Sequence, residues 1–167
     1  DEYKIFTVIR NPFDRIISTW RWWVMHQDGF YSKPQLHKYN IPNTSFKEYV
    51  LMIKQYFEGD KTLDDSPSKI TIDSERAPLI VSHIEKLDWW LTKYDGGLVK
   101  CDFLRFEDLN NEWRRYRKQV KISKPLPHKN DSGSMPFTSN RTKLYDDETY
   151  KIISEIYKYE IEMFNYV

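Results

Sequence analysis

The segment YKIFTVIRNPFDRIISTW, residues 3–20, constrains the fold more than any other part of this 167-residue sequence. Residues 3–9 are rich in Ile, Val, Phe, Tyr and Thr, and such a continuous apolar run predicts a fully buried strand of a parallel sheet. Asn11 predicts a helix N-cap, and Pro12 suits the first turn of a helix, where one N–H has no partner in any case. We expect that helix to run to about residue 26, with an apolar face formed by Phe13, Ile16, Ile17, Trp20 and Val24.

A second strand and further helices follow from local signals. Ser45 and Glu48 form a capping-box pattern, which predicts a helix from there to about residue 58. The run LVKCDFLRF, residues 98–106, predicts the second strand. Asp108 is placed to cap a helix over about residues 109–119.

The last helix is expected to begin near Asp146 and Asp147 and to reach almost to residue 167. The segments 28–44, 59–77 and 120–145 are expected to be loops, because they hold most of the glycine and proline of the chain. Two strands, each followed directly by a helix, predict an α/β fold with a parallel sheet. Because no linker divides the sequence, we expect residues 1–167 to form a single domain.

Composition excludes several classes of protein. A hydrophobic fraction of 40% with 31% charged residues is ordinary for a globular chain, and no apolar run has the length of a membrane span. The net charge of +1 argues against a nucleic-acid-binding protein. The one cysteine, Cys101, cannot form an internal disulfide and is expected to be a buried thiol in a reducing compartment. None of the four histidines has the spacing of zinc ligands, so we expect no metal site.

Arg10 stands at the carboxyl end of the first strand, where α/β proteins bind their ligands. The N–H groups and the dipole of the following helix favour an anion there. Ser18 lies eight positions after Arg10, about two helical turns along, and its hydroxyl would reach the same anion from another side. A guanidinium and a hydroxyl suit a phosphate monoester. The alternative is that Arg10 pairs with Asp14 and that Ser18 faces solvent.

The sequence RNPFDRIIS, residues 10–18, resembles the 3'-phosphate-binding motif of sulfotransferases that use 3'-phosphoadenosine 5'-phosphosulfate (PAPS). DFLRFEDL, residues 102–109, is similar to the strand-to-helix segment of the same enzymes. PLPHKNDS, residues 125–132, and the segment 144–166 resemble the closing section of carbohydrate-type sulfotransferases, in which an H-x-N-x-S element precedes a helix. The resemblance implies a three-layer, parallel-sheet α/β fold of the P-loop NTPase type.

The resemblance also implies roles for particular residues. Arg10 and Ser18 would hold the 3'-phosphate of PAPS, and the 120–145 loop would close over the nucleotide with Ser132 and Arg141 as phosphate contacts. The residues that the resemblance leaves as alternatives or in supporting roles are Lys129 and Lys143 in that loop, and Asp14 and Arg15, which would order the first loop. Related enzymes place an aromatic near the adenine at the position of Phe106, although the strand pattern favours a core aromatic there.

Two parts of the family's machinery have no match in this sequence. One is the element that holds the 5'-phosphosulfate, which consists of a strand, a phosphate loop with a lysine, and a helix. The other is the family's catalytic base. We therefore expect the chain to be the C-terminal portion of a longer enzyme. His26 and His128 are candidates for the base, although each is also explained by a structural hydrogen bond. The aromatic run 19–31 is a candidate lining for an acceptor cleft.

These observations predict a PAPS-dependent sulfotransferase that needs no metal and sulfates a hydroxyl or amine of a carbohydrate acceptor. The alternative is a non-catalytic sulfotransferase-like module that binds a nucleotide or a glycan. A small kinase is disfavoured, because no acidic residue suited to Mg²⁺ lies beside a phosphate loop. The single cysteine favours a bacterial or viral cytoplasmic enzyme, whereas the closing motif is typical of families found in the Golgi lumen.

Overall fold

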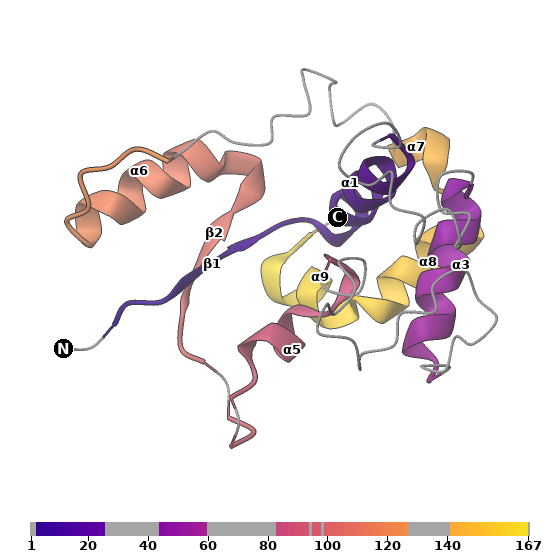
Figure 1. Ribbon diagram of the computed structural model, residues 1–167, viewed down its shortest axis with the longest axis horizontal. Coiled ribbons are helices and arrows are strands. Elements are labelled where there is room, and N and C mark those ends of the chain that lie inside the picture. The colour runs from indigo at the N-terminus through magenta and orange to yellow at the C-terminus, as the bar shows by residue number, and fades with distance from the viewer. Residues whose placement is uncertain are drawn as a thin grey trace, which may run out of the picture.

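The computed structural model describes residues 3–25, 44–59, 83–93, 95–97, 99–126 and 141–166 (Figure 1). The elements in chain order are β1 (Phe6–Ile9), α1 (Pro12–Met25), α3 (Phe46–Phe57), α5 (Leu87–Leu91), β2 (Asp102–Arg105), the 3-10 helix η2 (Phe106–Asp108), α6 (Leu109–Gln119), α7 (Arg141–Leu144), α8 (Asp147–Ile156) and α9 (Lys158–Phe164). None of these helices is long and apolar enough to cross a membrane.

The two strands are parallel neighbours, as the sequence predicts. Phe6 lies opposite Asp102 and Ile9 opposite Arg105. Because the register aligns their last residues, the segment that follows β1 meets the segment that follows β2 at one edge of the sheet (Figure 1). This edge is where Arg10 was expected to bind an anion.

Strand β1 is less buried than its composition predicts. Phe6 and Val8 keep 38% and 40% of their surface exposed, and only Ile9 is buried. Phe6 packs on α6 through Trp113 and Tyr116, with ring centroids 5.5 and 5.1 Å away, whereas Ile9 packs with α5 and α9. The expectation of a fully buried strand is thus wrong for the described residues. The strand is exposed because α6 packs on Phe6 at one end of β1, whereas α5 and α9 pack on Ile9 at the other end.

The main core is helical and lies where α1, α3 and α8 pack together (Figure 1). Its most buried side chains are Phe13, Ile16 and Ile17 on the predicted apolar face of α1, Tyr49, Val50 and Ile53 on α3, and Ile153 on α8. Fully burying one such aliphatic side chain contributes about 1.5–3 kcal/mol. The α1–α3–α8 packing therefore holds α1, and with it the end of β1, in a fixed place.

The predicted side-chain caps are present at α3 and α8 but not at α6, where Asp108 takes the N-cap position without a side-chain hydrogen bond to a helix N–H and accepts one from the Asn111 side chain instead. Ser45 and Glu48 form a complete capping box at α3, and the Asp146 carboxylate accepts the Thr149 N–H at 2.8 Å at α8. The expected single C-terminal helix is two helices, because α8 ends and α9 begins around Tyr157. The Tyr157 side chain is fully buried, and its hydroxyl donates to the carbonyl oxygen of Ile84.

Candidate functional site

Arg10 is the first residue after β1 and lies half-buried at the carboxyl edge of the sheet. Its guanidinium carbon is 4.2 Å from the centre of the Phe106 ring, which belongs to η2. Burial lowers the pKa of Arg10, an effect that the nearby carboxylates of Asp14 and Glu107 oppose. Because an arginine stays charged even when its pKa falls, this edge presents a partly desolvated cation.

The residue after it, Asn11, joins the two strand-end segments. Its side-chain oxygen accepts the Phe13 N–H at 3.0 Å, which confirms the predicted N-cap of α1. Its own N–H donates to Oε1 of Glu107 at 2.7 Å, 96 positions further along the chain. Pro12 has no N–H to offer. The N–H groups of residues 11–13 are therefore absent or engaged within the protein, so these three residues offer no backbone donor to an anion.

Asp14, in the first turn of α1, pairs with Arg141 at the start of α7. The Nε of Arg141 lies 2.5 Å from Oδ1 of Asp14, and Nη2 contacts Oδ2, which makes the pair bidentate. The hydrogen bonds that Arg141 donates to Asp14 raise the pKa of Arg141. Asp14 is 8% exposed, whereas the Arg141 side chain keeps 32% of its surface exposed, so water is excluded mainly from the Asp14 side of this ion pair. Asp14 thus ties α7 to α1, which agrees with its predicted ordering role.

Arg10, Asp14, Glu107 and Arg141 form a four-charge cluster drawn from β1's end, α1, η2 and α7. Each arginine is close enough to both carboxylates for the pKa to respond to them, and the pKa of Arg10 also responds to Arg141. The formal charges of the four groups cancel. The structure therefore gathers the two arginines that the sequence predicts for a phosphate site. It places beside them Asp14, which the sequence analysis had set next to Arg10, and Glu107, which it had not.

Ser18 lies on α1 one helical turn after Asp14, and positions four apart share a helix face. Its side chain is half-buried. Lys143, the loop alternative, is exposed on α7. The other predicted site residues, Ser132, Lys129, His26 and His128, lie outside the described residues, as does the part of the aromatic run 19–31 that follows residue 25. Among the described residues no group of acidic, histidine or cysteine side chains is arranged to hold a metal ion.

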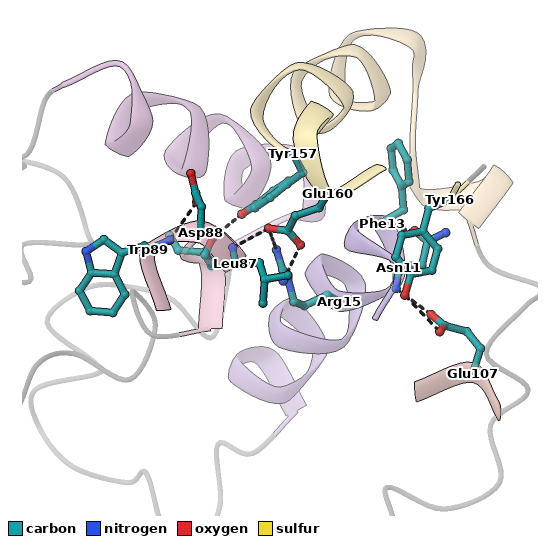
Figure 2. Close-up of polar contacts among 11 residues, drawn as sticks. Asn11, Phe13, Arg15, Leu87, Asp88, Trp89, Glu107, Tyr157, Glu160 and Tyr166 are labelled. Atoms are coloured by element: carbon teal, nitrogen blue, oxygen red, sulfur yellow. Dashed lines mark hydrogen bonds and ion pairs between the residues drawn. The ribbon is translucent and has the colours of Figure 1, made fainter. Parts of the chain in front are cut away.

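Arg15 belongs to a separate network with Glu160, Leu87 and Tyr157 (Figure 2). Its guanidinium lies 3.0 Å from Oε2 of Glu160 and donates to Oε1 at 3.2 Å. The same Oε1 accepts the Leu87 N–H at 2.9 Å, and the guanidinium covers the Tyr157 ring at 4.9 Å. Burial acts to lower the pKa of Arg15, but Glu160 more than offsets it, so the pKa is raised. This network joins α1, α5 and α9, so Arg15 holds helices together here, whereas the sequence predicted that it orders the first loop.

Sequence reasoning missed Glu107 and Glu160. Glu107 had a usable signal, since it follows the second strand and the ends of parallel strands share an edge. Glu160 had none, because an acid in an acidic and aromatic helix usually faces solvent. Phe106 was interpreted as a core aromatic, and this is wrong: 45% of its surface is exposed. Cys101 is half-buried rather than buried.

Comparison with known proteins gives one match of broad extent. The whole chain, residues 1–167, fits the family described as Sulfotransferase family. No curated protein and no solved structure matches the chain significantly.

Proposed function

The chain belongs to the sulfotransferase family, and from this premise we propose that it transfers the sulfuryl group of PAPS to a hydroxyl or amine of a carbohydrate acceptor. The observation that carries the proposal is the position of Arg10. It provides a half-buried guanidinium at the shared carboxyl edge of two parallel strands, in the motif that resembles the family's 3'-phosphate site. The three-layer sheet, the upstream loop for the 5'-phosphosulfate and the single-domain organisation are parts of the same proposal.

Arg10 and Ser18 would hold the 3'-phosphate. A guanidinium presents two parallel N–H donors to a phosphate, and partial burial strengthens the attraction by reducing screening. Holding this phosphate fixes the position of the sulfur atom, which an acceptor would attack in line. Ser132 is proposed as a further phosphate contact from the 120–145 loop, and a base, for which His26 and His128 are the candidates, would take the acceptor's proton.

Arg141 has two possible parts in such a site, and the geometry favours the indirect one. Asp14 lies one helical turn from Ser18, so its carboxylate would repel a phosphate that Ser18 binds. The bidentate contact with Arg141 cancels that charge. We propose that Arg141 assists binding mainly by neutralising Asp14, with direct contact to the phosphate as the alternative.

Calorimetry with adenosine 3',5'-bisphosphate tests the proposal. We expect Arg10→Ala to weaken binding by about 1.5–3 kcal/mol, the scale of a lost charged hydrogen bond. Arg114→Ala is the matched control, because Arg114 is an exposed arginine on α6 that contacts Asn111. A folded Arg10→Ala protein with unchanged affinity would refute the assignment. Binding without sulfuryl transfer to any glycan acceptor would favour the non-catalytic module instead.

A further inference from the structure

Phe106 is a large apolar side chain at the surface, and one face of its ring is covered by a charged group. The ring keeps 45% of its surface exposed, so hydrophobic burial does not explain its place. The guanidinium of Arg10 lies over it, with the central carbon 4.2 Å from the ring centroid. A cation at this distance from a ring face is attracted by the ring's quadrupole, and a planar guanidinium also stacks on the ring.

Glu107 follows Phe106, and it contacts Asn11, the residue that follows Arg10. Its Oε1 accepts the Asn11 N–H at 2.7 Å, and the hydroxyl of Tyr166 donates to Oε2 at 3.5 Å (Figure 2). The strand register explains this pairing, because Ile9 lies opposite Arg105 and the next two residues of each strand end therefore face each other. Arg10 and Asn11 are thus fixed, one after the other, by Phe106 and Glu107.

We infer that Phe106 is a positioning residue for the 3'-phosphate site: it holds the Arg10 guanidinium in place from one face. The inference rests on the proposed function and deepens it, since it gives Phe106 a role through Arg10 rather than a place beneath the adenine. An arginine side chain that is already held loses less rotamer freedom when it binds. Glu107 supports the same geometry by fixing the backbone at Asn11.

The two roles for Phe106 predict different ligand preferences. If the ring acts through Arg10, Phe106→Leu weakens binding of adenosine 3',5'-bisphosphate but leaves AMP, which lacks the 3'-phosphate, almost unaffected. We expect the preference for the bisphosphate to fall about two- to fivefold, the scale of a cation–π contact at a partly exposed site. Phe106→Tyr keeps the ring and should retain the preference. In an Arg10→Ala background, Phe106→Leu should change the preference no further.

Isothermal titration calorimetry of each variant with both nucleotides measures these preferences. Trp89→Leu is the matched control, because Trp89 is an exposed aromatic on α5 whose ring contacts Trp90. Equal weakening of both nucleotides by Phe106→Leu would place the ring against the adenine and overturn the inference, as would no change in either. A wild-type protein with no preference for the bisphosphate would instead reject the proposed function, and the inference with it. Circular dichroism of Phe106→Leu checks the fold.

Discussion

Glu107 and Glu160 perform the same local task in very different surroundings. Each carboxylate accepts a backbone N–H at the start of a helix, Glu107 from Asn11 before α1 and Glu160 from Leu87 at the start of α5. Glu160 is 4% exposed and is also paired with Arg15 (Figure 2). Glu107 is exposed, and its second oxygen accepts a long hydrogen bond, of 3.5 Å, from the Tyr166 hydroxyl.

The difference separates a contact that holds the scaffold from one that shapes a ligand edge. A buried carboxylate needs a permanent cation, and once paired it cannot be released without a large free-energy cost. An exposed carboxylate exchanges its partner for water at little cost, so it suits the rim of a site that a ligand enters. Removal of Glu160 should therefore lower the free energy of unfolding more than removal of Glu107, which should act mainly on ligand binding.

Glu160→Ala should produce the largest loss of stability. It leaves the charge of Arg15 buried without a partner and deprives the Leu87 N–H of its acceptor, for an expected loss of about 3–5 kcal/mol in the free energy of unfolding. Urea denaturation followed by circular dichroism measures it. Glu162→Ala on the same helix is the control, because Glu162 is exposed and pairs only with Lys158, at 3.8 Å. A loss below about 1 kcal/mol would show that Glu160 does not stabilise the fold as a buried ion pair.

The Asp14–Arg141 pair should come next, with a loss of about 1.5–3 kcal/mol on Arg141→Met, the scale of hydrogen bonds to charged groups. The same variant should weaken binding of adenosine 3',5'-bisphosphate, because it leaves the Asp14 charge uncancelled. Asp14→Asn in that background should restore binding if Arg141 acts by neutralisation. Calorimetry on the single and double variants decides: binding that stays weak in the double variant would make Arg141 a direct phosphate ligand.

Local signals were enough to predict most elements but not the contacts between them. Asn11-Pro12, Ser45 with Glu48, and Asp146 mark helix starts within a few residues, and α1, α3 and α8 begin where these signals lie. The Arg15–Glu160 contact spans 145 positions and the Asn11–Glu107 contact spans 96, so no window of sequence contains both partners. Phe106 was misjudged for the same reason, because its exposure depends on which elements cover the strand end.

For the site, sequence reasoning found the two arginines and Asp14 but missed Glu107. Arg10 and Arg141 lie in one cluster because their motifs end a strand and begin a helix at the same sheet edge. The position of Glu107 just after the second strand was a usable signal, but it was passed over because a binding site for an anion is not where a carboxylate is first sought. The two acids are explained only once the fold shows the N–H and the guanidinium that each one holds.

Glu107→Ala should have a small effect on stability, about 0.5–1.5 kcal/mol for one hydrogen bond. Glu107→Gln should cost less, because an amide oxygen still accepts the Asn11 N–H. Thermal unfolding of both variants, compared with Glu160→Ala, measures the contrast between the two carboxylates directly. Equal losses at positions 107 and 160 would show that burial and the Arg15 pairing do not distinguish them.

Asp146 adds an exposed carboxylate that caps a helix, and it predicts the smallest effect and a pH dependence. Hydrogen bonds from the Thr149 backbone and hydroxyl, followed by Lys47, lower the pKa of Asp146 to about 2. Because the folded-state pKa lies below the unfolded value of about 3.9, the stabilisation is complete above pH ~4 and is lost as the pH falls through about 2. Asp146→Asn preserves a good N-cap, so it should leave neutral-pH stability nearly unchanged and flatten the acid limb of the unfolding profile. Titrating urea stability from pH 6 to pH 2 in both proteins measures this, and parallel acid limbs would mean that the carboxylate is not held at the start of α8.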